Sequence, residues 1–126
     1  MIDHISIGVR DLAASAKFYD AALVPLGYVR MIVRETTIGY GKQYPDFWLN
    51  ERRAMAPVDP DTGTHVCMRA SSPEAVKAFY DSAMSAGATS DGPPGQRPEY
   101  TDGYFAAFVR DPDGNKIEAV TFIKKV

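Results

Sequence analysis

The chain has 126 residues, a formal net charge of -2 and a single cysteine, Cys67, which excludes an internal disulfide. An apolar fraction of 45% and a charged fraction of 24% are ordinary for a globular protein, and the small net charge gives no electrostatic footprint for nucleic acid. No apolar run has the length of a membrane span, and the N-terminus lacks the pattern of a signal peptide, so we expect a cytoplasmic protein.

The sequence contains an internal repeat. The offset that carries His4 onto His65 also carries Phe18-Tyr19-Asp20 onto Phe79-Tyr80-Asp81, without a gap. A common register across a strand-like run, a loop and a helix-like run is typical of a duplicated supersecondary unit.

The first copy begins with a strand, in which Ile5, Ile7 and Val9 alternate with polar or small residues. Asp11 is the expected N-cap of a helix whose apolar residues recur at helical spacing. Three further strands are predicted at about 28–33, 36–40 and 46–50.

The second copy repeats this order after a linker at 52–63. A strand precedes a helix that starts at Ser72 and Pro73. Later strands are expected near Ala88, at 104–110 and at 116–122, and the Gly- and Pro-rich segment 91–103 reads as a long loop. The sequence therefore predicts an α+β fold of two βαβββ modules, at about 1–56 and 64–126.

Three side chains in this pattern suit a metal site. On the strand alternation, His4 and His65 point away from the helices, and Glu118 in the last strand is in phase with them. Pairing the copies by pseudo-twofold symmetry brings the three together on a concave surface. Two imidazoles and one carboxylate leave open coordination positions and suit zinc, iron, manganese, cobalt or nickel. Cys67 lies on the same face, where we expect a small buried hydrophobe.

The duplication, the two strand histidines and the closing segment from Asp111 to Glu118 (DPDGNKIE) resemble the vicinal oxygen chelate superfamily. That group includes glyoxalase I, extradiol dioxygenases, fosfomycin-resistance enzymes, epimerases and bleomycin-binding proteins. The resemblance covers nearly the whole chain. It implies one domain over residues 1–126, with a curved mixed sheet around a shared cavity, a divalent metal held by His4, His65 and Glu118, and a homodimer.

The resemblance leaves the activity open, because the position of a fourth ligand falls at Trp48, which cannot bind a metal. Glyoxalase-type isomerisation uses two carboxylates, whereas two histidines and one glutamate resemble the dioxygenase triad. The leading expectation is a metal-dependent enzyme, a glyoxalase-related lyase or isomerase or a dioxygenase. The alternative is a metal-free binding or drug-sequestering protein of the bleomycin-resistance type. Whether the site closes within one chain or between two also stays open.

Further residues are expected to shape the pocket. Tyr104, one strand from Glu118, is expected to donate a hydrogen bond to a metal-bound oxygen, so that Glu118 and Tyr104 are the candidate catalytic residues. Trp48, Arg97 and Tyr100 are the candidate substrate-binding residues, with the arginine and tyrosine suited to an anionic or phenolic group. The expected partner is a small oxygenated molecule, with no nucleic acid and no membrane.

Overall fold

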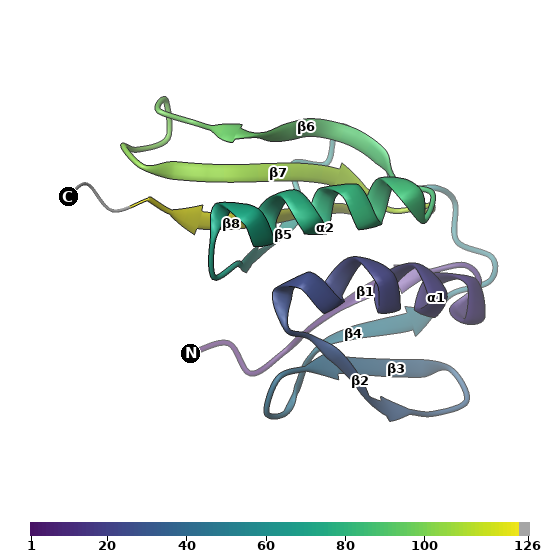
Figure 1. Ribbon diagram of the computed structural model, residues 1–126. Helices are drawn as coiled ribbons and strands as arrows, with labels where there is room; N and C mark the ends of the chain where they lie inside the picture. The colour runs from purple at the N-terminus through teal and green to yellow at the C-terminus, as the bar shows by residue number, and fades with distance from the viewer. Residues whose placement is uncertain (124–126) are drawn as a thin grey trace.

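The computed structural model describes residues 1–123 and consists of two βαβββ modules (Figure 1). The first contains β1 (Ile5–Val9), α1 (Leu12–Leu23), the 3-10 turn η1 (Val24–Leu26), β2 (Val29–Val33), β3 (Thr37–Gly41) and β4 (Pro45–Glu51). The second contains β5 (His65–Arg69), α2 (Pro73–Ser85), β6 (Thr89–Gln96), β7 (Tyr104–Arg110) and β8 (Lys116–Phe122). The predicted α+β class and the duplicated order of elements are confirmed.

Each module forms its own four-stranded mixed sheet. The strand orders are β1-β4-β3-β2 and β5-β8-β7-β6, and in both sheets the first strand of the module runs parallel to its last strand. Within the described residues no strand pairing joins the two sheets. Each helix covers one face of its sheet, and α1 and α2 lie side by side (Figure 1). We call the sheet face opposite the helix the open face of a module.

The helices begin at the caps that the sequence predicts. The side chain of Asp11 accepts a hydrogen bond from the backbone of Ala14, and that of Ser72 accepts one from Ala75, which satisfies backbone donors in the first turn. Gly27 ends η1 with a left-handed φ of 81°, which glycine adopts without strain. In the part of the chain that the structure describes, neither helix has the length and apolar character needed to cross a membrane.

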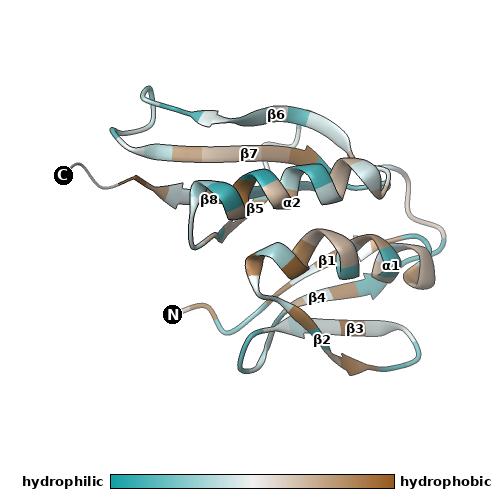
Figure 2. Ribbon diagram, in the orientation of Figure 1, coloured by the Kyte–Doolittle hydropathy of each residue, from teal (hydrophilic) through white to brown (hydrophobic). Residues whose placement is uncertain are grey.

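The predicted long loop at 91–103 is wrong in its first half, because β6 continues to Gln96. Pro93 and Pro94 are tolerated there since β6 is an edge strand, where a proline removes no hydrogen bond from a second neighbour. The register to β7 shifts twice along β6, on either side of Gly92. Figure 2 shows the difference in composition, with β7 mostly brown and β6 pale to teal.

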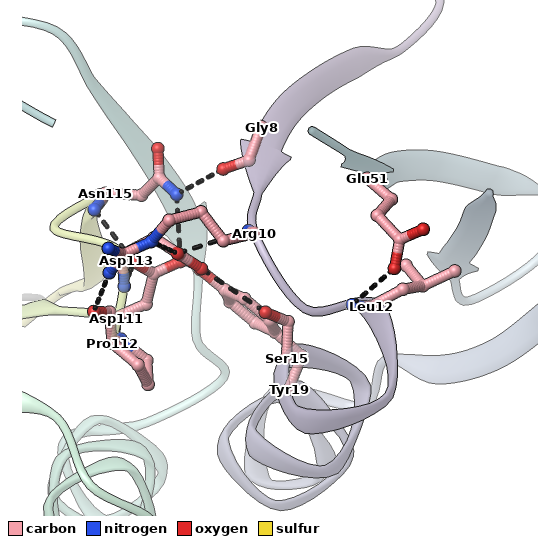
Figure 3. Close-up of polar contacts among 10 residues, drawn as sticks. All are labelled: Gly8, Arg10, Leu12, Ser15, Tyr19, Glu51, Asp111, Pro112, Asp113 and Asn115. Carbon is pink, nitrogen blue, oxygen red and sulfur yellow. Dashed lines mark hydrogen bonds and ion pairs between the residues drawn. The ribbon is translucent and has the colours of Figure 1, made fainter. Parts of the chain in front are cut away.

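The turn between β7 and β8 binds the second module to the first (Figure 3). Asp113 accepts a 2.8 Å hydrogen bond from Nε of Arg10, and Asn115 donates through Nδ2 to the carbonyl oxygen of Gly8 at 2.9 Å. Asp113 is 5% exposed, so this ion pair is largely shielded from water on its carboxylate side. The turn therefore fixes the end of β1 relative to the second sheet.

Candidate functional site

The open face of the second module carries a histidine–glutamate–tyrosine cluster. Nε2 of His65 lies 2.9 Å from Oε1 of Glu118, and the hydroxyl of Tyr104 donates a hydrogen bond to Oε2 of the same carboxylate. These residues come from β5, β8 and β7, which are neighbours in the sheet. Glu118 is only 2% exposed, whereas the side chain of His65 is 38% exposed. The carboxylate is thus held from both sides, with one imidazole facing solvent.

Cys67 lies beside this cluster, because the strand register places it next to Glu118. The expectation of a buried cysteine is wrong, since the residue is accessible to solvent. Even so, the protein packed around the thiol, followed by the negative charge of Glu118, raises the pKa of Cys67 to about 12. Burial and the hydrogen bond to Glu118 likewise raise the pKa of Tyr104. Both groups are therefore protonated at neutral pH.

Aromatic and basic side chains border the cluster. The rings of His65 and Phe108 are 6.3 Å apart, and the guanidinium of Arg97 lies 5.6 Å from the centre of the Phe108 ring. Tyr100 packs edge-on against Tyr104, with ring centres 5.2 Å apart. The structure therefore brings two of the predicted substrate-binding residues next to the cluster, and their roles remain predictions.

The open face of the first module holds the other two predicted residues, His4 and Trp48, which line a cavity of about 490 Å³. The Trp48 ring covers Gly39, where a Cβ atom would lie 2.9 Å from it. The guanidinium of Arg34 lies 5.2 Å from the centre of that ring. His4 precedes β1, and its Nδ1 lies 2.7 Å from a carboxylate oxygen of Asp3. The geometry thus gives Trp48 a stacking surface. His4 also lines a smaller cavity with Cys67 and Arg69 of β5, but among the described residues it forms no group of metal ligands with His65 and Glu118.

The donors of the second module fit part of a metal coordination sphere. Bonds of about 2.0–2.2 Å from a tetrahedral zinc ion to nitrogen and oxygen place neighbouring ligand atoms about 3.4 Å apart, so the 2.9 Å between His65 and Glu118 would widen by about half an ångström around the ion. However, no group of three or more His, Cys, Asp or Glu side chains within residues 1–123 is arranged to hold a metal ion. The residues of one chain therefore offer two of the three predicted ligands at one place.

Comparison with known proteins identifies the family. Residues 27–119 match the model of the Glyoxalase/Bleomycin resistance protein/Dioxygenase superfamily. The chain belongs to this superfamily. No curated protein matches the chain.

Solved structures of the superfamily share the fold over nearly the full chain. A glyoxalase/bleomycin resistance protein from Albidiferax ferrireducens T118 is 34% identical, with a TM-score of 0.80 and coverage of 94% of this chain and 95% of that one. A glyoxalase/bleomycin resistance protein/dioxygenase family enzyme from Burkholderia phytofirmans PsJN is 18% identical, with a TM-score of 0.74 and coverage of 97% and 98%. A glyoxalase-related enzyme from Fulvimarina pelagi is 21% identical, with a TM-score of 0.72 and coverage of 95% and 86%.

Proposed function

We propose that this superfamily member is a divalent-metal-dependent enzyme acting on a small oxygenated molecule. His65 and Glu118 are the ligands from the second module, and His4 from a first module is the third. The observation that carries the proposal is the 2.9 Å separation of Nε2 of His65 and Oε1 of Glu118, on a carboxylate that is otherwise buried. A buried carboxylate beside an accessible imidazole suits a site that takes up a cation from solvent.

The third ligand comes from a second copy of the chain in this proposal. His4 of the same chain is paired with Asp3, outside the second module's cluster. β1 and β5 each lie at an edge of their sheets in the described part of the chain, and such edges favour pairing with another strand. A homodimer in which the first module of one copy meets the second module of the other brings His4 toward the cluster.

The residues around the ligands have distinct tasks. A bound divalent metal would act as a Lewis acid toward a substrate oxygen. Tyr104 holds Glu118 in place through its hydroxyl. Arg97 and Tyr100 orient an anionic or phenolic group, and Trp48 supplies a flat surface for the substrate. Because Trp48 stands where a second carboxylate is expected, lyase or dioxygenase chemistry is favoured over the two-carboxylate isomerisation.

A metal-free binding protein is the second candidate function, and one observation favours it. Both oxygens of Glu118 already have partners, His65 and Tyr104, so the carboxylate is satisfied without a cation. In that case the stacked pair of Arg34 and Trp48 is the recognition surface, for an aromatic ligand.

Titration with Co²⁺, followed by optical absorption, separates the two candidates. We expect the wild type to bind Co²⁺ saturably, and His65→Ala and Glu118→Gln each to bind at least about tenfold more weakly. The matched control is Asp61→Asn, which removes an exposed carboxylate in the segment that links the two modules and should bind Co²⁺ like the wild type. Equal affinity in all four proteins would overturn the metal site.

A further inference from the structure

A second cavity lies between the two modules. None of the residues assigned to the proposed metal site lines it, although it adjoins a hollow that His4 borders. It has a volume of about 250 Å³ and is lined by Tyr28, Lys42, Gln43, Tyr44 and Asp46 of the first module and by Arg69 of the second. Pockets for drug-sized ligands are typically about 300–1,000 Å³, so this one suits a more compact molecule.

A β-bulge directs Asp46 into this cavity. In the pairing of β3 with β4, Tyr40 lies opposite Phe47 and Gly41 lies opposite Pro45, so Asp46 has no residue across from it. Pro45 lines the open-face cavity of the first module, whereas Asp46 lines the cavity between the modules. Bulges commonly redirect a side chain beside a functional site.

The carboxylate of Asp46 has one oxygen without a partner. Its Oδ2 accepts a 3.1 Å hydrogen bond from the hydroxyl of Tyr28. Its Oδ1 is buried and has no donor within hydrogen-bond distance in the described part of the chain. Since buried carboxylate oxygens in native proteins nearly always have a donor, a cationic N–H group is the complementary partner.

The rest of the lining suits a molecule that carries an aromatic ring and a negative charge as well. Two tyrosine rings line the cavity, and Nζ of Lys42 lies 6.0 Å from the centre of the Tyr28 ring. Arg69 adds a second cation, from the opposite module. One carboxylate that lacks a donor and two cations in one small cavity are complementary to a zwitterion.

We propose that this cavity binds a compact zwitterionic amine of the amino-acid type, with its ammonium group on the carboxylate of Asp46 and its carboxylate toward Lys42 and Arg69. Because Oδ1 of Asp46 is buried, a rotation of this carboxylate brings Oδ1 to the ligand. The ligand contacts both modules, so binding links their relative position to the presence of the ligand.

Titration of the ¹⁵N-labelled protein by NMR tests this site with three probes. They are phenylalanine, phenethylamine, which lacks the carboxylate, and 3-phenylpropionate, which lacks the amine. We expect saturable shifts at the amides of Tyr28, Asp46 and Arg69 with phenylalanine, and at least about tenfold weaker binding of each of the other two probes. The absence of saturable shifts, or shifts confined to the cluster of His65 and Glu118, would overturn the proposal.

Variants assign the contacts. Asp46→Asn should weaken phenylalanine binding at least about tenfold, while Asp61→Asn, which removes an exposed charge outside the cavity lining, should leave it unchanged. Wild-type affinity in Asp46→Asn means that the charge of Asp46 takes no part in binding and overturns the proposal. Should Asp46→Asn fail to fold, the exposed Arg69→Ala decides instead, since loss of binding is expected and unchanged binding contradicts the site. The Co²⁺ titration monitors other residues, so either proposal can fail without the other.

Discussion

The hydroxyl of Tyr19, on the helix of the first module, donates a 2.6 Å hydrogen bond to Oδ2 of Asp111, in the β7–β8 turn of the second (Figure 3). Both residues are buried. Oδ1 of Asp111 accepts from the backbone of Asp113 and Asn115, so one carboxylate closes the turn and holds the module interface. The segment from Asp111 to Glu118 therefore begins at the interface between modules and ends at the candidate site.

Tyr19→Phe tests the contribution of this bond to stability. Removing the hydroxyl leaves a buried carboxylate oxygen with one donor fewer, and we expect the free energy of unfolding to fall by about 1–3 kcal/mol. Tyr80→Phe is the matched control, because its hydroxyl bonds to Ser90 in an exposed setting. Urea unfolding measures both. An equal loss of unfolding free energy in the two variants would mean that the buried bond contributes no more to stability than the exposed one.

The pH dependence of stability reports on Asp111 directly. Burial raises the pKa of Asp111, against the lowering effect of the hydrogen bonds from Tyr19 and Asn115. A folded-state pKa above the unfolded value, about 3.9, means that the native state binds the proton more tightly. The contribution of protonated Asp111 to the free energy of unfolding is therefore complete below a pH of about 3.9 and is lost as pH rises through the folded-state pKa.

Comparison with Asp111→Asn isolates this effect from the other carboxylates. We expect the unfolding free energy of the wild type, minus that of the variant, to decrease as pH rises from about 3.5. Denaturant unfolding at a series of pH values measures the difference. A difference that is flat or that increases with pH would contradict the raised pKa.

Cys67 should react slowly with alkylating agents although it is accessible. With the thiol pKa raised to about 12, the thiolate is scarce at pH 8, and we expect iodoacetamide to react at least about tenfold more slowly than with a free thiol of pKa about 8.5. Glu118→Gln removes one cause of the shift and should speed the reaction. Mass spectrometry of timed samples gives the rates, and a wild-type rate like that of free cysteine would refute the expectation.

Gly39→Ala should displace Trp48, the only tryptophan in the chain. The added Cβ would lie 2.9 Å from both the Trp48 ring and Pro45, and overpacking of this kind costs about 1–3 kcal/mol. Gly8→Ala is the control, since the nearest atom there is the sulfur of the flexible Met55 side chain. We expect the tryptophan emission to shift only in Gly39→Ala. The same spectrum in both variants would show that Trp48 does not rest on Gly39.

Sequence periodicity predicted much of the fold because the same local patterns occur in both modules. The offset between His4 and His65 revealed the duplication, and the bounds 104–110 and 116–122 match β7 and β8. The alternation along β8 also placed Glu118 on the face of His65, and the structure brings the two side chains into contact.

Other features depended on tertiary context. The glycines and prolines of 91–96 favour a loop, but pairing with one neighbour keeps them in β6 as an edge strand. The bulge at Asp46 arises from the pairing of β3 with β4, which no local pattern indicates. The positions of His4 and Trp48 relative to the second module's cluster depend on how the modules assemble. The spacing of residues along the sequence does not predict this assembly.

The most direct test of the metal-site proposal is the metal content of the protein, measured by elemental mass spectrometry after purification without chelators or a histidine tag. The proposal predicts near-stoichiometric divalent metal in the wild type and its loss in His65→Ala, in Glu118→Gln and in His4→Ala. Protein that contains no metal and takes up none on titration, or metal that persists in all three variants, would contradict it.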